Sequence, residues 1–133
     1  MGVELVQLAP DSEESDVERV LSGVGTVVFA AGLSESLCVR NPELAFAVNA
    51  YWPGYIASIA SRNLITQRFI YISTAKVYAE FLEGYIDENS PTRARQAYGR
   101  SHLEGERRVH AAGVDGSLQT LALRIANLVG APS

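Results

Sequence analysis

Short apolar runs alternate with amphipathic stretches along the whole chain, and this alternation limits the fold more than any other feature. Residues 26–31 and residues 68–73 are rich in β-branched and aromatic side chains, which is typical of strands buried on both faces. Residues 3–8 and residues 118–124 predict two further strands. Four strands separated by helices predict right-handed crossovers and a mostly parallel sheet.

Three helices are predicted between these strands. A short helix ends just before Gly23, and a second begins at Pro42 and repeats apolar residues at spacings of three or four. Pro53 lies inside the second pattern and predicts a kink or a later start. The third helix covers residues 94–112. Because ligands bind beyond the carboxyl ends of parallel strands, that edge of the sheet is where chemistry is expected.

Composition excludes several classes of protein. The 133 residues suffice for one domain, and the net charge of -4 offers no basic face for nucleic acid or an anionic membrane. No apolar run approaches the ~20 residues that cross a bilayer, and the first residues lack a signal peptide's pattern. The one cysteine, Cys38, excludes an internal disulfide and a cysteine-based zinc cluster, and no metal site is predicted. We therefore expect a cytoplasmic domain.

Three residues carry the chemistry that the sequence predicts. Thr74 directly follows a buried strand, and Tyr98 and His102 are four residues apart on one face of a predicted helix. A hydroxyl, a phenol and a neighbouring cation form an acid/base relay for proton movement coupled to hydride transfer. A phenol ordinarily loses its proton near pH ~10, so such a relay needs nearby positive charge worth about 4 kcal/mol at neutral pH.

The motifs around these residues resemble those of extended short-chain dehydrogenases/reductases, the NAD-dependent sugar-nucleotide epimerases and dehydratases. Residues 68–78 resemble the family's central strand with its serine/threonine motif, and residues 98–106 resemble its catalytic tyrosine helix. Residues 123–130 are similar to the next strand and turn, and residues 27–32 to an earlier strand end on the cofactor side. The matches follow the family's order and spacing.

The resemblance implies a set of partners and residue roles. It implies NAD or NADP as cofactor, a nucleotide sugar or related small molecule as substrate, and a homodimer formed through the two long helices. Tyr98 is implied to exchange the substrate's proton, Thr74 to hydrogen-bond the substrate oxygen, and Asn127 to contact the nucleotide-sugar phosphate. Asn49 is implied to support the active-site end of its helix. The residues implied to lie beside the cofactor are Ala31, Gly32, Asn49, Ser73, Tyr98 and His102.

Two departures from the family pattern stand out. His102 occupies the place of a lysine, and a histidine near its ordinary pKa of ~6.5 is mostly neutral at pH 7, which predicts impaired catalysis. The one Gly-x-Gly, at residues 23–25, precedes a predicted strand and lacks a third glycine. It is therefore a loop and not a phosphate cradle, which puts cofactor binding by this chain in question.

The expected fold of residues 1–133 is accordingly a partial NAD(P)-binding Rossmann-like α/β domain. Its mostly parallel sheet is expected to carry helices on both faces, and to lack the first βαβ unit and the substrate domain. By resemblance, residues 3–8 correspond to the family's third strand. We expect this strand to pair at a new place or to remain unpaired, and the truncated polypeptide to have weakened stability.

Two function hypotheses from different classes follow. The first is the central fragment of an NAD(P)-dependent nucleotide-sugar epimerase or dehydratase, impaired as it stands. The second is a non-catalytic Rossmann-like module that binds a partner or serves as a subunit. A flavodoxin-like domain ranks third, because it predicts acidic strand ends, whereas residues 31–32 and residues 73–74 are Ala-Gly and Ser-Thr.

Overall fold

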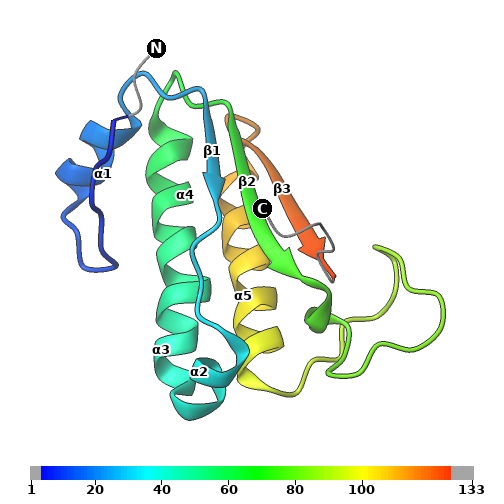
Figure 1. Ribbon diagram of the computed structural model, residues 1–133. Coiled ribbons are helices and arrows are strands. Elements are labelled where there is room, and N and C mark those ends of the chain that lie inside the picture. The colour runs from blue at the N-terminus through cyan, green and yellow to red at the C-terminus, as the bar shows by residue number, and fades with distance from the viewer. Residues whose placement is uncertain (1–3, 127–133) are drawn as a thin grey trace, which may run out of the picture.

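A three-stranded parallel sheet forms the centre of the molecule (Figure 1). The computed structural model describes residues 4–126. The strands β1 (Thr26–Phe29), β2 (Arg68–Thr74) and β3 (Gln119–Ile125) lie in that order and pair in parallel. Phe29 pairs with Tyr71, and Thr74 pairs with Ile125. The mostly parallel, partial Rossmann-like sheet predicted from the apolar runs is confirmed.

Helical segments join the strands, as the alternation predicts. They are α1 (Glu14–Leu21), α2 (Glu35–Arg40), α3 (Pro42–Phe46), the π-helical turn η1 (Ala47–Tyr51), α4 (Trp52–Arg62), the 3₁₀ turn η2 (Ala75–Val77) and α5 (Ala97–Ala112). The predicted irregularity in the second helix is present, because η1 separates α3 from α4 just before Pro53. Proline lacks the N–H that an α-helix needs four residues after each carbonyl, so a regular helix is not possible there. The helix α2 was not predicted.

The hydrophobic core lies between the sheet and the helices α4 and α5. Phe29, Phe69 and Tyr71 point from the strands into this core and are buried. The opposite face of the sheet is open in the described part of the chain, where the side chains of Val28 and Leu121 are 59% and 49% exposed. The expectation of helices on both faces is therefore wrong for residues 4–126. The physical reason is that α1 packs against α4 instead of against the sheet.

The predicted strand at residues 3–8 does not form within residues 4–8. The described sheet accordingly has three strands and not four. Leu5 is 93% exposed, and Leu8 alone of this segment's leucines packs against the core. A strand is stable only when its backbone N–H and C=O groups pair with a neighbour, and no described strand lies beside this segment. The segment thus takes the second of the two expected outcomes and remains unpaired.

Close packing of α5 depends on Gly105. A Cβ atom at this position would overlap the backbone carbonyl of Asn49 and would lie 2.7 Å from the Tyr71 hydroxyl oxygen. We expect Gly105→Ala to lower the free energy of unfolding by about 1–3 kcal/mol, because the crowded backbone cannot move aside. The expected loss is the net effect, after the gain of about 1 kcal/mol that alanine ordinarily brings to a helix. Urea denaturation followed by circular dichroism measures the change.

The matched control for Gly105 is Gly25, where an added Cβ would meet nothing within 4 Å. We expect Gly25→Ala to leave the urea midpoint almost unchanged. Equal midpoints for the two variants would contradict the packing argument.

Candidate functional site

The carboxyl ends of the three strands meet at one edge of the sheet, together with the start of α5. β2 ends at Thr74, its neighbour β3 ends at Ile125, and the chain leaving β1 runs through Ala31 and Gly32. In a parallel sheet this edge collects side chains that are distant in the sequence. The residues singled out from the sequence, apart from Asn127, lie at or near this edge. Asn127 itself lies outside the described residues.

Thr74 is buried at the strand end and already has one local partner. Its hydroxyl oxygen accepts a hydrogen bond of 3.2 Å from the backbone N–H of Lys76, which caps the 3₁₀ turn η2. Since a hydroxyl can both accept and donate, its proton is still available for another oxygen. A cavity of about 200 Å³ adjoins it, and both Thr74 and Tyr98 line this cavity.

Tyr98 and His102 lie on one face of α5, as their spacing predicts. Their ring centroids are 4.9 Å apart and the rings meet edge to face. Tyr98 is half-buried, whereas His102 is almost fully buried. The structure therefore brings Thr74, Tyr98 and His102 together from β2 and α5, which are more than 20 residues apart in the sequence.

His102 is held by a contact that the sequence analysis missed. The hydroxyl of Tyr71, on β2, lies 2.9 Å from the Nδ1 atom of His102. Burial lowers the pKa of His102 from 6.5 to about 4, and the nearby carboxylate of Glu106 offsets only part of this effect. The imidazole is therefore neutral at pH 7 and supplies no positive charge to Tyr98.

Asn49 joins the segment after β1 to α5. Its side-chain oxygen accepts a hydrogen bond of 2.9 Å from the backbone N–H of Leu33, and its amide nitrogen donates to the Ser101 hydroxyl at 3.1 Å. The side chain is fully buried. A Cβ on Gly32 would lie 3.3 Å from the Asn49 side-chain oxygen, so a larger residue would crowd this loop. Ala31 and Gly32 are exposed, and a Cβ on Gly32 would lie 3.8 Å from the Cε1 atom of His102.

A buried ion pair lies next to these residues and was not among the predicted site residues. Glu106, on α5, accepts hydrogen bonds from the guanidinium of Arg124, on β3, with the shortest contact at 2.7 Å. The Ser73 hydroxyl donates to the same carboxylate at 2.5 Å, and Arg124 also donates to the Tyr78 hydroxyl at 2.9 Å. These contacts raise the pKa of Arg124 above its ordinary value. The network ties β2, β3 and α5 together.

One signal could have identified this network from the sequence. Glu106 follows His102 by four residues, so it lies on the same face of α5 as Tyr98 and His102. A carboxylate on a face that packs against a sheet requires a cationic partner. No periodicity, however, indicates that this partner is Arg124. For Ser73, the structure shows a hydroxyl engaged by Glu106, and its predicted role beside a cofactor stays a prediction.

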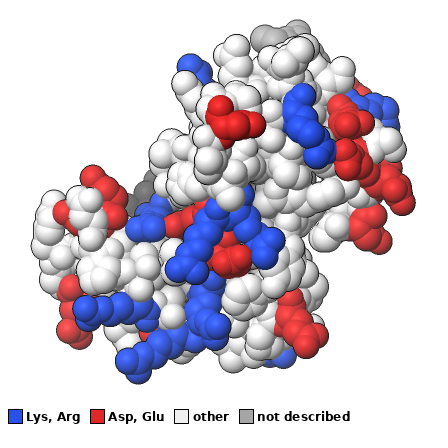
Figure 2. Space-filling view, turned by 180° about the vertical axis from the view of Figure 1, so that it is seen from behind, with Lys and Arg blue, Asp and Glu red and all other residues white. Residues whose placement is uncertain are grey.

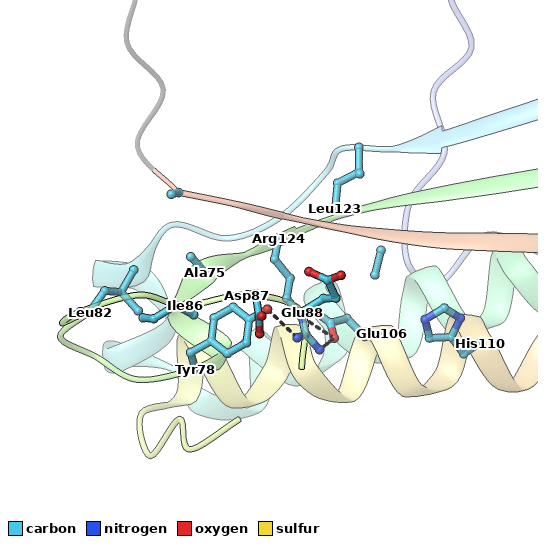
Figure 3. A pocket seen from close by; sticks show the side chains of 13 residues that line it. Ala75, Tyr78, Leu82, Ile86, Asp87, Glu88, Glu106, His110, Leu123 and Arg124 are labelled. Atoms are coloured by element: carbon cyan, nitrogen blue, oxygen red, sulfur yellow. Dashed lines mark hydrogen bonds and ion pairs between the residues drawn. The ribbon is translucent and has the colours of Figure 1, made fainter. Parts of the chain in front are cut away.

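A larger cavity, of about 640 Å³, lies beside the Glu106–Arg124 pair (Figure 3). The close-up shows Arg124 and Tyr78 directed toward each other, with Glu106 rising from α5 and His110 farther along the same helix. The Arg124 guanidinium lies over the Tyr78 ring, 4.8 Å from its centroid. Asp87 and Glu88 also line the cavity. Its wall therefore combines a paired cation with carboxylates from the loop before α5.

The glycine-containing loops before and after β1 lie at opposite edges of the sheet. Gly32 is exposed and carries no side chain, so a ligand can approach its backbone closely at the edge where Thr74 and His102 lie. The other glycine pair, Gly23 and Gly25, lies at the opposite edge, because the Gly25 carbonyl accepts from the backbone at the start of β2. That pair is thus unable to hold a phosphate group at the candidate site, in agreement with its interpretation as a loop.

Within residues 4–126, no cluster of three or more His, Cys, Asp or Glu side chains has the arrangement of a metal site. Within the same residues, no helix has both the length and the apolar character to cross a membrane.

Comparison with known families gives one match over almost the entire chain. The model of the NAD dependent epimerase/dehydratase family matches residues 5–132. This is the family whose motifs the sequence resembles.

Individual relatives support the same assignment. The chain is 33% identical over 123 residues to a protein of Haloferax volcanii named "Probable low-salt glycan biosynthesis reductase Agl14", covering 88% of this chain and 39% of that protein. It is 31% identical over 106 residues to a UDP-glucose 4-epimerase of Mycoplasma genitalium, covering 77% of this chain and 31% of that protein. The chain therefore spans less than half the length of these curated relatives.

A solved structure shares the fold. RMD from Pseudomonas aeruginosa, complexed with NADPH, superposes with a TM-score of 0.76 at 21% identity, over 86% of this chain and 40% of that one. The partial Rossmann-like fold is thus present in a longer protein that binds a nicotinamide cofactor.

Proposed function

Because the chain belongs to the NAD-dependent epimerase/dehydratase family, we propose that it contributes the catalytic edge for hydride transfer at a carbon of a nucleotide sugar. The observation that carries the proposal is the convergence of Thr74, Tyr98 and His102 beside the exposed backbone of Gly32. NAD or NADP is the family's cofactor, and a nucleotide sugar is the substrate class in the name of the Mycoplasma relative.

Thr74 and Tyr98 are proposed to act on the same oxygen of the substrate. Both line one cavity of about 200 Å³, and the Thr74 hydroxyl retains a proton to donate after its oxygen has accepted from Lys76. The half-buried Tyr98 side chain, in its deprotonated phenolate form, is proposed to take up the proton of the reacting sugar hydroxyl as hydride leaves the adjacent carbon, which returns Tyr98 to the neutral phenol. Loss of the hydroxyl proton and of the hydride together converts the alcohol to a ketone.

The cofactor side of the site is proposed to include Ala31, Gly32, Asn49, Ser73 and His102. When bound, NAD or NADP supplies the nicotinamide carbon that accepts the hydride. The backbone of Ala31 and Gly32 lines the approach to this position, while Asn49 keeps the loop in place through Leu33 and Ser101. These residues are proposed to bind and orient the cofactor, whereas the proton transfer is assigned to Tyr98.

His102 is the reason that we propose impaired catalysis. A neutral imidazole beside Tyr98 offers none of the electrostatic stabilisation that a phenolate requires, whereas a lysine at this position would carry a positive charge. The same observation favours the second candidate, a non-catalytic binding or subunit module. The position of Gly23 and Gly25 at the far edge of the sheet supports that candidate as well.

A homodimer through α4 and α5 forms part of the proposal. A groove of about 510 Å³ runs between the outer faces of these helices and exposes Tyr51, over which the Arg108 guanidinium lies 4.4 Å from the ring centroid. Viewed from behind, basic side chains gather around acidic ones in the middle of the molecule (Figure 2). Glu104 pairs with Arg108 at 2.8 Å on α5, so the helix presents both charges to a second copy.

A cytoplasmic location also belongs to the proposal, because Cys38 is buried and unpaired.

Calorimetric titration with NAD⁺ and then NADP⁺ tests the proposed function. We expect saturable binding of one of them, with a dissociation constant roughly in the millimolar range, since only part of the dinucleotide is contacted. In Gly32→Val we expect binding to weaken at least about tenfold, because a side chain there crowds Asn49 and fills the approach.

Gly25→Ala is the matched control, because Gly25 is a glycine of the opposite edge with free space around it. We expect its affinity to equal that of the unmodified chain. The absence of any heat at millimolar cofactor would rule out the cofactor site and leave the binding or subunit module. Equal weakening in both glycine variants would show that the loop at Gly32 has no special part in binding.

A further inference from the structure

A carbonyl group in the irregular helix receives its hydrogen bond from outside the helix. In a regular helix the Asn49 carbonyl would accept from the residue four positions later, which is Pro53 and has no N–H. The hydroxyl of Tyr71 donates to this carbonyl at 2.6 Å. Tyr71 is fully buried, and the bond crosses from β2 to the π-helical turn η1. The position of the hydroxyl proton is thereby determined.

That proton position determines which nitrogen of His102 carries hydrogen. A carbonyl oxygen only accepts, so the single proton of the Tyr71 hydroxyl points to Asn49 and is not available to His102. The 2.9 Å contact between the Tyr71 hydroxyl and Nδ1 of His102 is then a hydrogen bond only if Nδ1 donates. A neutral imidazole carries one N–H, so its other nitrogen, Nε2, holds an unshared electron pair.

The surroundings of His102 keep this arrangement intact. The titratable groups that face the ring are Tyr71 from β2 and Tyr98 and Glu106 from α5. The Glu106 carboxylate is occupied by Arg124 and Ser73. From the segment after β1, Gly32 approaches the ring, where an added Cβ would lie 3.8 Å from Cε1. No charged group among the described residues hydrogen-bonds Nε2.

Nε2 remains accessible to a ligand. Among residues 4–126, Trp52 Nε1 is the one buried side-chain nitrogen or oxygen that lacks a hydrogen-bond partner. His102 Nε2 makes no hydrogen bond within the same residues and is not among these buried atoms, and His102 keeps 6% of its surface exposed. An accessible electron pair at the edge of the candidate site is a hydrogen-bond acceptor.

We infer that Tyr71 is a positioning residue that holds His102 as the Nδ1–H tautomer, and that Nε2 accepts a hydrogen bond from a hydroxyl group of a bound ligand. The ligand part of this inference rests on the proposed function. Its consequence is a reversal of polarity, because a lysine at this position donates, whereas His102 accepts. A sugar or ribose hydroxyl satisfies such a site by donating its own proton.

Nitrogen-15 NMR of the unmodified chain tests the tautomer without any ligand. In ¹⁵N-labelled protein at pH 7, we expect His102 to show a proton on Nδ1 and an unprotonated Nε2 resonance. The opposite pattern, with the proton on Nε2, would overturn the inference. In Tyr71→Phe the acceptor for Nδ1–H is lost, so we expect the Nε2–H form to become detectable.

Tyr78→Phe is the matched control, because this second buried tyrosine hydroxyl contacts Arg124 and not His102. We expect its His102 tautomer to equal that of the unmodified chain. A merely structural role for Tyr71 would change stability in Tyr71→Phe without changing the tautomer, and that result would also contradict the inference.

The ligand part is tested by adding NAD⁺ and, separately, UDP-glucose to the labelled protein. We expect one of them to shift the Nε2 resonance toward that of a hydrogen-bonded nitrogen while Nδ1 keeps its proton. The probe that causes the shift identifies the source of the hydroxyl. Calorimetric binding of both without such a shift would contradict the accepting role of Nε2. No binding at all would contradict both that role and the proposed function, while the tautomer is decided separately.

Discussion

Replacing Arg124 by methionine is expected to lower the free energy of unfolding by about 3 kcal/mol. The substitution leaves the Glu106 carboxylate, whose side chain is 4% exposed, without its cationic partner in the protein interior. Breaking one partner of a buried ion pair typically costs about 3–5 kcal/mol. We expect the lower end of this range, because the Arg124 side chain keeps 22% of its surface exposed. Urea denaturation followed by circular dichroism at pH 7 measures the loss.

Arg107→Met is the matched control for this prediction. Arg107 also faces a glutamate on α5, Glu104, but at 3.9 Å and with 68% of its side chain exposed. Exposed pairs of this kind contribute at most about 1 kcal/mol, so we expect a small change. If both methionine variants unfolded at the same urea concentration, the Glu106–Arg124 pair would have no special part in stability.

Acidification is expected to destabilise the protein through His102 by up to about 3 kcal/mol. In the unfolded chain this histidine binds a proton with its ordinary pKa of 6.5, whereas in the folded protein burial lowers its pKa to about 4. Between these two values the unfolded state holds more protons, so stability falls as the pH falls from 6.5 to 4. Each unit of difference is worth about 1.4 kcal/mol. Well above pH 6.5 both states are neutral at this residue, and its contribution to the pH dependence disappears.

The measurement compares unfolding free energies of the unmodified chain and His102→Asn at several pH values from 7.5 to 4. Asparagine keeps an N–H for the Tyr71 hydroxyl but binds no proton, so the acid-dependent loss should be smaller by about 3 kcal/mol. Carboxylates titrate in both proteins and cancel in the comparison. His110→Asn, which changes the exposed histidine near the end of α5, is expected to keep the full acid dependence. Parallel pH curves for all three proteins would contradict the prediction.

Local sequence patterns predicted most of the regular structure. The runs that became β1, β2 and β3 are apolar and β-branched, and their parallel arrangement follows from the helices between them. The kink expected from Pro53 corresponds to the π-helical turn η1. The spacing of four residues was sufficient to bring Tyr98 and His102 together, because contacts within one helix depend only on its own geometry.

Predictions that required a neighbouring element were less successful. Residues 4–8 have a strand-like pattern but form no strand, since strand formation depends on a partner that the pattern does not specify. Helices were expected on both faces of the sheet, yet in the described residues α4 and α5 cover one face and α1 packs against α4. Burial of a strand residue is decided by the element that lies over it, which the strand's own sequence does not contain.

The sequence by itself determined the family, the strand and helix types, and the choice of Thr74, Tyr98 and His102. These follow from short-range periodicity and from motifs that lie within single elements. The tertiary structure alone decided that Tyr71 hydrogen-bonds His102 across 31 positions and that Arg124 pairs with Glu106 across 18. Such contacts join different elements, and their energies depend on distance, burial and dielectric environment. The charge state of His102 is therefore a property of the packed molecule and not of the residue type.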